Sequence, residues 1–436
     1  MKPTVNYKFR ASCSAAILIF SAPLFATDGH LMIGAGSVNE SMGGAGIATS
    51  LDAIGSNYNN ISSLAFLNRS SIEFGAELFV PDRSLSSSFN GFGSGTVDSK
   101  TREAVIPSFG LAYKTGGPWT FGFSATGIGG FGVDYPATLP GGSPISLPQP
   151  YGFGAVYSKY ELLQMTPSVA YQATEDLSLG IGFNLNYASL AVNPWPATIP
   201  NASGYPSGSS AASTWGEGFT VGATYKFLSN LSLGLSFKSP QWFNDFSWNS
   251  QYPNGAPSNF SFRLDYPMIV GGGLSYKPVE DLTLAADIKW INYKDTAGFQ
   301  ASNFAATALG SYVRGFGWQD IWTLALGGQY KLTPRFALRA GYNYSQNPIP
   351  SSQQFFNVFA PAIVQHHITA GGGFNVTPDL EINIAYYHAF QNTASGPFIS
   401  NGGPGYPPIN QAIPGSQVTN RLSEDSFSAQ VVYRFQ

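Results

Sequence analysis

The feature that most constrains the fold of this chain is an alternation of apolar residues with polar or small residues, which returns along most of its length. In segment 177–187 every odd position holds Leu, Ile, Phe or Tyr, and every even position holds Ser, Gly or Asn. Segments 282–290 and 336–344 repeat the alternation. Because successive side chains of a β-strand point to opposite faces, each segment predicts a strand with one apolar and one polar face.

Segments of this kind predict about 14 strands, joined by connections of two lengths. The predicted strands cover residues 70–82, 102–114, 118–133, 156–172, 176–190, 214–227, 230–246, 259–277, 281–295, 318–331, 334–346, 364–375, 379–392 and 423–436. Connections after even-numbered strands are mostly about three to five residues long and carry turn-forming Gly, Pro, Asn or Asp, whereas those after odd-numbered strands are long. Short turns at one end and long loops at the other are the pattern of bacterial outer-membrane barrels.

Aromatic residues and composition support a barrel. The tyrosines just before the short turns would form an aromatic girdle at the periplasmic interface: Tyr113, Tyr171, Tyr225, Tyr276 and Tyr330. A net charge of -3 excludes a nucleic-acid binder that works through a general basic field. No apolar run beyond the N-terminus reaches the ~18–20 residues of a spanning helix. With a soluble β-sandwich or propeller as the alternative, we expect an all-β fold, a 14-stranded antiparallel transmembrane β-barrel over residues 70–436.

The N-terminus predicts export followed by a plug. Residues 1–26 have the basic start, the short apolar run and the small residue before a cleavage point that mark a secretory signal, with a core helix as the alternative. Cleavage would remove Cys13, the only cysteine. Residues 27–69 precede the first strand, and the lumen of 14 strands is too wide for wall side chains to fill. We therefore expect residues 27–69 to form a hatch inside the lumen, the alternative being a disordered periplasmic tail.

Short motifs in a fixed order run through nearly the whole mature chain: Met42-Gly43-Gly44-Ala45-Gly46-Ile47-Ala48, Asp52-Ala53 and Asn59 in the hatch, then Pro167-Ser168-Val169-Ala170-Tyr171, Leu177-Ser178-Leu179-Gly180, Leu235-Ser236-Phe237-Lys238-Ser239-Pro240, Asp287-Ile288-Lys289-Trp290-Ile291-Asn292-Tyr293, Trp318-Gln319-Asp320-Ile321-Trp322 and Leu338-Arg339-Ala340-Gly341-Tyr342-Asn343-Tyr344. In these motifs the chain resembles the FadL family of outer-membrane long-chain fatty-acid transporters. Two departures stand out. The family hatch usually reads Asn-Pro-Ala where this chain has Asn59-Asn60-Ile61, and the chain ends in Gln436 after Phe435, where such barrels commonly end in an aromatic residue.

The resemblance implies an outer-membrane protein of a Gram-negative bacterium that acts as a monomer. Its partners would be a long-chain fatty acid or another hydrophobic small molecule and the outer-membrane lipid, with no nucleic acid. The hatch residues implied are Gly43, Gly44, Gly46, Asp52 and Asn59.

The third predicted strand holds an unusual run of glycines. Gly129, Gly130 and Gly132 surround Phe131, and glycine inside a strand often marks a bulge or kink. The resemblance implies that this strand bends inward and leaves a lateral opening, whereas the residues alone also allow a loose strand end entering the next loop. Three aromatic residues of the second long loop are further candidates for contact with a ligand: Tyr151, Phe153 and Tyr157.

No catalytic or metal-binding constellation is evident, and no cofactor is expected. Adjacent His366 and His367 would point to opposite faces of a strand and so could not hold one metal together. His30, near the mature N-terminus, is expected to be a solvated residue, with a place in the lining of the lumen as the alternative. The function implied is passive uptake of hydrophobic molecules by lumen binding, hatch rearrangement and lateral exit, the alternatives being a nonspecific porin or a surface-loop adhesin. An energised receptor would need ~22 strands.

Overall fold

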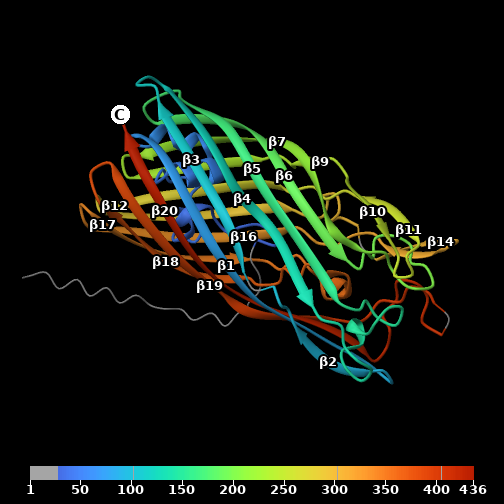
Figure 1. Cartoon of the computed structure of the whole chain (residues 1–436). Coiled ribbons are helices and arrows are strands. Elements are labelled where there is room, and N and C mark those ends of the chain that lie inside the picture. The colour runs from blue at the N-terminus through green and yellow to red at the C-terminus, as the bar shows by residue number, and fades with distance from the viewer. Residues whose placement is uncertain (1–27, 102, 302, 404) are drawn as a thin grey trace, which may run out of the picture.

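The computed structural model shows a closed antiparallel β-barrel of 14 strands (Figure 1), which confirms the fold class expected from the alternation. The structure describes residues 28–436 except 102, 302 and 404. The expected signal peptide, residues 1–26 with Cys13, lies outside the described residues. Each wall strand pairs with its neighbours in the chain, and β1 pairs with both β20 and β3, which closes the barrel.

The wall strands vary widely in length, the longest of them lying toward the two ends of the chain and in the middle. They are β1 Ser70–Phe89, β3 Ala104–Lys114, β4 Trp119–Tyr135, β5 Val156–Gln172, β6 Leu177–Asn193, β7 Gly208–Leu228, β8 Leu231–Lys238, β12 Met268–Val279, β13 Leu282–Asn292, β16 Ile321–Thr333, β17 Phe336–Ser345, β18 His366–Asn375, β19 Leu380–Gly396 and β20 Ser416–Phe435.

Two of the strands expected from the sequence were wrong as single strands. Segment 230–246 divides into β8 and β9 (Trp242–Phe243), and segment 259–277 divides into β11 (Pro257–Phe262) and β12. Pro240 lies in the first break and Pro267 in the second, and proline cannot donate to a ladder hydrogen bond.

The long loops carry short elements that the sequence analysis did not anticipate. They are β2 Gly93–Asp98, β10 Phe246–Gln251, β14 Phe304–Thr307, β15 Gly310–Val313 and the 3-10 helices η2 Pro144–Ser146 and η3 Ser351–Asn357. β2 extends the sheet from β1, β10 pairs with β11, and β14 pairs with β15.

The two faces of the wall separate as the alternation requires. On β6 the side chains of Leu179, Ile181 and Phe183 are 48%, 54% and 50% exposed, whereas Asn184 and Asn186 are fully buried against the lumen. The exposed side chains of this wall point outward from the barrel. The five expected girdle tyrosines are all among them.

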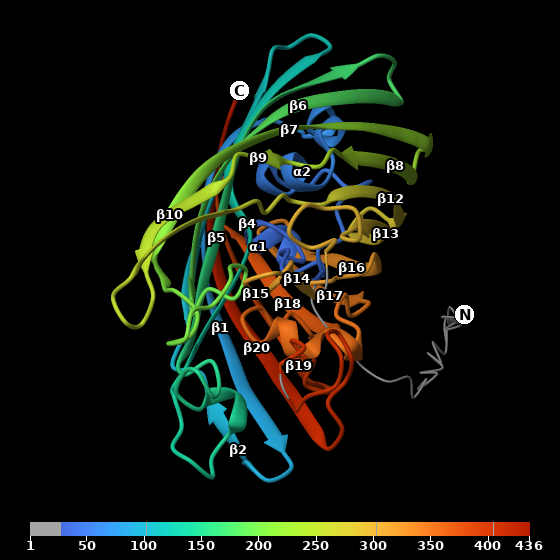
Figure 2. The ribbon, with the colours of Figure 1, turned by 90° about the vertical axis from the view of Figure 1, so that its right-hand side faces the viewer.

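The N-terminal segment fills the lumen (Figure 2). Helix α1 (Gly36–Glu40), helix α2 (Ala53–Asn59) and the 3-10 helix η1 (Ile61–Phe66) lie within the ring of strands. The side chain of Asp52 caps α2 by accepting a hydrogen bond from the Gly55 amide at 3.2 Å. Among the described residues, no helix is long and apolar enough to cross a bilayer.

Asn60, which stands where the family usually has proline, caps η1 and ties the hatch to the wall. Its carboxamide oxygen accepts a hydrogen bond from the Ser62 amide at 3.2 Å. Its carboxamide nitrogen donates to the Ile47 carbonyl at 2.7 Å and to the Thr224 hydroxyl at 3.1 Å. Proline has no side-chain groups that could make these bonds.

Candidate transport site

The barrel wall separates between β3 and β4. Pairing of β3 with β4 runs from Lys114–Thr120 up to Ser108–Thr126. Beyond that pair, in the described ladders, residues 104–107 of β3 pair only with β1, and residues 127–135 of β4 pair only with β5. The β4–β5 register also shifts between Gly127 and Gly129, which places a β-bulge at the predicted position. Two strand edges are therefore left facing each other without a shared ladder.

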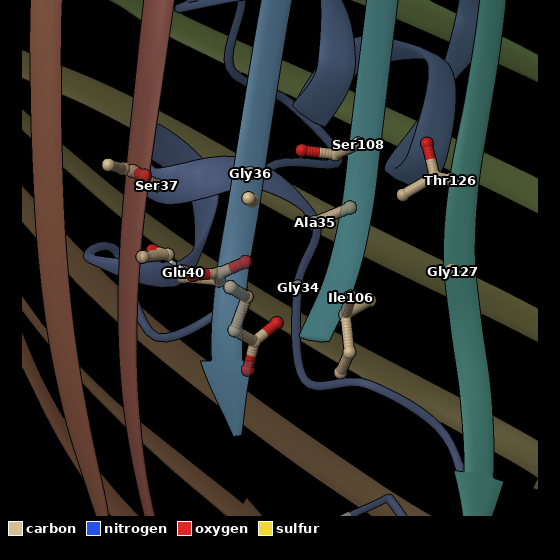
Figure 3. A pocket seen from close by; sticks show the side chains of 13 residues that line it. Gly34, Ala35, Gly36, Ser37, Glu40, Ile106, Ser108, Thr126 and Gly127 are labelled. Atoms are coloured by element: carbon tan, nitrogen blue, oxygen red, sulfur yellow. Dashed lines mark hydrogen bonds between the residues drawn. The ribbon is translucent and has the colours of Figure 1, made fainter. Parts of the chain in front are cut away.

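A small cavity lies where the pairing of β3 with β4 ends (Figure 3). Ile106 and Ser108 of β3 and Thr126 and Gly127 of β4 line it, and the chain that leads into Gly34 crosses between the two strands. The wall carboxylate of Glu77 lies there too. Gly36, Ser37 and Glu40 also line this cavity, so helix α1 of the hatch lies beside the point where the two strands part.

The segment from Asp28 to Met32, which we call the strap, occupies the free inner edge of β4. The Gly130 amide donates to the His30 carbonyl at 2.9 Å, and the Met32 amide donates to the Ile128 carbonyl at 3.3 Å. Leu31 also forms an antiparallel bridge with Gly129. The strap thus takes the hydrogen-bonding place that β3 leaves empty.

Glycine at 129 and 130 permits this close approach. A Cβ atom on residue 129 would lie 2.7 Å from the His30 carbonyl oxygen, and one on residue 130 would lie 2.5 Å from the Tyr160 carbonyl oxygen. Both contacts are with backbone atoms, so a side chain at either position would have to displace the strap or the neighbouring strand.

The side chain of His30 anchors the strap in a cage of aromatic rings, which corrects the expectation of a solvated residue. The imidazole stacks on Phe299 with ring centroids 4.7 Å apart, and the rings of Tyr160, Tyr266, Tyr293 and Trp318 complete the cage. Its Nδ1 lies 3.3 Å from the Tyr293 hydroxyl, and its Nε2 has no hydrogen-bond partner among the described residues. Burial lowers the pKa of His30 to about 3, so the ring is neutral at physiological pH.

Two tyrosine hydroxyls hold the ends of the strap. Tyr293 donates to the Asp28 carbonyl at 2.6 Å, and Tyr58 of α2 donates to the Met32 carbonyl at 2.8 Å. Burial raises the pKa of the Asp28 carboxyl to about 6, with Lys289 acting in the opposite direction.

A cavity of about 350 Å³ joins the strap to the separated strands, a volume within the range of small-molecule sites. Four of the residues predicted from the sequence line it together: Gly129, Gly130, Phe131 and Gly132. Val105, which is 71% exposed on the outer face, also lines the cavity, as do Lys159 and Glu161, which form an exposed ion pair with 2.8 Å between their charged atoms. The cavity therefore extends from the strap to the outer surface of the wall.

The three predicted loop aromatics do not line this cavity. Tyr151 is 83% exposed, and Phe153 is buried among Tyr205, Phe355 and Phe359 of other loops. Tyr157 lies on β5, opposite Asp134 and Asn193. Sequence reasoning also missed Tyr160, whose ring packs on both His30 and Phe131; its place on the inner face of β5 was the only available signal.

The hatch is fastened to the wall through its backbone. The carboxylate of Asp287 on β13 accepts hydrogen bonds from the Gly46 and Ile47 amides at 2.6 and 2.9 Å. The carboxylate of Glu73 on β1 accepts from the first two amides of α2, at 2.8 and 3.1 Å. These amides have no partner within their own helix or turn, so the two carboxyl groups satisfy donors that would otherwise be buried without a hydrogen bond.

The predicted hatch residues serve this packing. Gly43 and Gly44 have φ angles of +68° and +81°, which suit glycine, and a Cβ on residue 43 would lie 2.7 Å from the Tyr342 amide nitrogen. A Cβ on residue 46 would lie 2.7 Å from the Asn59 carboxamide nitrogen. Asp52 accepts a hydrogen bond from Gln430 of β20 at 3.1 Å. In the part of the chain that is described, no group of three or more His, Cys, Asp or Glu residues could hold a metal ion.

Comparisons with known proteins agree with the fold. The family model described as outer membrane protein transport protein (OMPP1/FadL/TodX) matches residues 30–435. The long-chain fatty acid transport protein of Salmonella typhi is 22% identical over 374 residues, covering 77% of this chain and 82% of that protein.

Solved structures share the fold. A FadL homologue of Pseudomonas aeruginosa superposes with a TM-score of 0.71 at 18% identity, covering 94% of this chain and 100% of that one. The toluene transporter TodX of P. putida gives a TM-score of 0.70 at 19% identity, covering 93% of this chain and 99% of that one.

Proposed function

This chain belongs to the outer membrane protein transport family (OMPP1/FadL/TodX), and from that premise we propose that it takes up long-chain fatty acids or molecules of similar hydrophobicity by passive diffusion. Members of the family are transporters of hydrophobic compounds in the outer membrane of Gram-negative bacteria, and this chain shares that location and general role. The family consists of transporters and channels rather than enzymes. The choice of cargo and the route are the parts that we propose.

The observation that carries the proposed route is the cavity shared by the strap and the two unpaired strand edges. In this proposal a hydrophobic molecule enters from the extracellular loops, displaces the strap, and leaves sideways between β3 and β4 into the membrane. The strap is held to β4 by two backbone hydrogen bonds, and each contributes only about 0.5–1.5 kcal/mol net. Release also breaks the hydrogen bonds from Tyr293 and Tyr58 and the packing of His30 in its aromatic cage, so the incoming ligand has to replace those contacts.

The fastened hatch favours this route over a straight passage through the lumen. Asp287 and Glu73 together accept four hatch amides, whereas the strap leads directly to the outer surface of the wall. A nonspecific porin would need an open water-filled lumen, so planar bilayers distinguish the two functions: a porin conducts ions freely and a plugged transporter does not.

The experiment that tests the route measures uptake of radiolabelled oleate by cells that carry Gly129→Leu, Gly130→Leu or Gly132→Leu. Each side chain would enter the passage, so we expect uptake to fall by about tenfold or more, since even small displacements at a positioned site carry large rate costs. Gly272→Leu on β12 is the matched control, because a Cβ there meets only Leu235 at 3.7 Å and the Gly234 carbonyl at 3.9 Å.

Folding is checked by the shift in gel mobility between heated and unheated barrel. Unchanged uptake by three correctly folded variants would exclude lateral exit at this place.

A further inference from the structure

Two buried carboxyl groups join the hatch to the wall beside the place where β3 and β4 part. Glu40 ends helix α1 of the hatch and is 3% exposed, and Glu77 of β1 is 4% exposed. Their side chains are hydrogen bonded to each other. Both line the small cavity at the end of the β3–β4 pairing, where Figure 3 shows Glu40. The route proposed above makes no use of this pair.

The hydrogen bond between Glu40 and Glu77 requires one proton. An ionised carboxylate can only accept, so one of the two groups must be in its acid form and donate. Glu77 also accepts hydrogen bonds from the Ser426 hydroxyl at 2.6 Å and from the Tyr387 hydroxyl. Because three donors are directed at Glu77, Glu77 is the carboxylate and Glu40 carries the proton.

Burial keeps this proton on Glu40. It raises the pKa of Glu40 well above the ordinary value of 4.5, and the adjacent Glu77 raises that pKa further. Loss of the proton would leave two carboxylates in contact in a space that excludes bulk water, which is costly. None of the ion pairs within 4.0 Å among the described residues includes either group. No cation of that part of the chain therefore lies close enough to offset a second charge.

The other ionisable groups around the pair do not neutralise it. Helix α1 packs against β1, β18, β19, β20 and α2. Arg339 and Arg434 pair with Glu381 of β19, and the charge of Arg83 acts on Glu424. The ionisable side chains that these elements bring near the pair are Glu73 and Arg83 of β1, Asp52 at the start of α2, His367 of β18, Glu381 and Tyr387 of β19, and Glu424 of β20.

Three further hydrogen bonds join α1 and the residue after it to the wall in the described structure. The Ser428 hydroxyl donates to the Glu40 carboxyl group, and the Val38 amide donates to the Gln430 side-chain oxygen at 3.4 Å. The Thr369 hydroxyl donates to the Ser41 carbonyl at 3.0 Å. With so few attachments, replacing the bond between Glu40 and Glu77 by repulsion would weaken the docking of α1.

The small cavity gives water access to the pair. Its volume of about 10 Å³ is close to the smallest space that admits a water molecule. The hydroxyls of Ser37 and Thr126 line it and have no hydrogen-bond partner among the described residues. Thr126 is also the last residue of β4 that pairs with β3. Further parting of the strands would therefore hydrate Glu40, and hydration lowers the cost of ionising a buried acid.

We propose that Glu40 and Glu77 form a proton-dependent latch, which holds helix α1 on the wall while the two groups share a proton and releases it when the proton is lost. This inference concerns the hatch itself and holds for any cargo. The docked helix binds the proton more tightly than a released helix does. The latch therefore stabilises docking fully below about pH 4.5 and is lost as the pH rises through the raised pKa of Glu40.

The test measures the exposure of α1 as a function of pH in the full mature protein. Ser37→Cys places a thiol at a fully buried side chain of α1 whose hydroxyl has no hydrogen-bond partner among the described residues, so the exchange breaks no hydrogen bond. Its rate of reaction with methyl methanethiosulfonate is measured from about pH 5 to about pH 10. Each rate is divided by that of Ser229→Cys, an exposed residue between β7 and β8, which corrects for ionisation of the thiol.

With Glu40 intact, the relative rate should rise by about tenfold or more over this range, because each pH unit above a pKa changes the ratio of acid to base tenfold. In Glu40→Gln the amide donates to Glu77 at every pH, so the rate should change by less than about twofold. Glu77→Gln removes the second charge and should also flatten the rise. Glu424→Gln, at a nearby buried carboxyl of β20, is the matched control and should keep it.

Two results would overturn the latch. A relative rate that stays flat with Glu40 intact would show that ionisation does not free α1. An undiminished rise in both Glu40→Gln and Glu77→Gln would assign the pH dependence to another group, such as Asp28 of the strap, which both variants keep. Neither result bears on oleate uptake, and the gel mobility of heated and unheated protein confirms that each variant is a folded barrel.

Discussion

At the scale of single residues, the strap carries two buried groups whose ionisation favours its release, His30 as the pH falls and Asp28 as the pH rises. Burial lowers the pKa of His30 to about 3 from an ordinary value of 6.5, and raises the pKa of Asp28 to about 6 from an ordinary value of 3.8. A docked strap therefore keeps His30 neutral, while it holds a proton on Asp28 more readily than a free strap does. These two shifts give docking opposite dependences on pH.

The direction of each pH dependence follows from whether the docked or the free strap binds the proton more readily. The free strap protonates His30 first, so the contribution of His30 to docking is present above about pH 6.5 and is lost as the pH falls toward about 3. The docked strap protonates Asp28 first, so its contribution is present below about pH 3.8 and is lost as the pH rises through about 6. Between about pH 6 and 4 the two contributions largely cancel.

We therefore predict that wild-type docking changes little from about pH 7 to 5, whereas single variants reveal the two dependences. Asp28→Asn leaves His30 alone and should loosen the strap as the pH falls. His30→Phe keeps the ring stacking, leaves Asp28 alone, and should tighten the strap over the same interval. The measurement is the mobility of a spin label on Met32→Cys by electron paramagnetic resonance. Identical profiles in all three proteins would show that these groups do not control docking.

At the scale of elements, the parting of β3 and β4 is a local property of two strands within a continuous wall. Strand β4 keeps its full ladder with β5 up to Tyr135, so the separation does not weaken the barrel as a whole. The gap between β3 and β4 begins at Ile106 and Gly127. A Cβ built on residue 127 would lie 3.7 Å from the Ile106 Cβ. That spacing is close to the mean of about 3.8 Å found in disulfide bonds.

This spacing predicts that the double variant Ile106→Cys with Gly127→Cys forms a disulfide. The bond would join β3 to β4 where their pairing ends. If a hydrophobic molecule leaves there, β3 and β4 must be free to part, and the oxidised protein should take up oleate several-fold more slowly than the reduced protein. Uptake before and after treatment with a reductant is the measurement, and the two single-cysteine variants are the controls. Equal uptake in the oxidised and reduced states would show that this end of the gap does not move during transport.

The wall strands and the bulge of β4 can be predicted from the sequence, whereas the loop hairpins and the surroundings of His30 cannot. The alternation marks the wall strands because lipid lies on one side and a polar lumen on the other, and the glycines of β4 mark the bulge because a close backbone approach requires them. The strands of the hairpins β10–β11 and β14–β15 are only four to six residues long, so alternation covers too few positions to distinguish them from loop. His30 was wrongly expected in solvent because its cage comes from residues 130 to 288 positions away, which no local pattern reports.

At the scale of the whole molecule, the barrel encloses the hatch, and hydrogen bonds join the hatch to the barrel wall. Nearly every residue from Asp28 to Ala65 is buried, and the carboxylates of Asp287 and Glu73 accept amides from two different parts of this segment. Both carboxylates are almost fully buried themselves. The wall thus supplies the acceptors that the short hatch helices and turns lack.

We predict that the side chains of Asp287 and Glu73 keep the hatch closed. Asp287→Ala or Glu73→Ala leaves two buried amides without a partner. A buried donor left without a hydrogen bond costs about 1–3 kcal/mol, so each variant should lower the free energy of hatch opening by about 2–6 kcal/mol. The wall ladders are untouched, so heated and unheated gel mobility should remain that of the folded barrel. Ion conductance in planar bilayers should rise from a closed baseline, and Asp287→Asn or Glu73→Gln, which keep one acceptor oxygen, should conduct less than the alanine variants.

A wild-type protein that already conducts ions freely would instead identify an open pore. Alanine variants that stay closed would mean that packing of the hatch alone holds it, and that the lateral route does not depend on these carboxylates to keep the lumen shut.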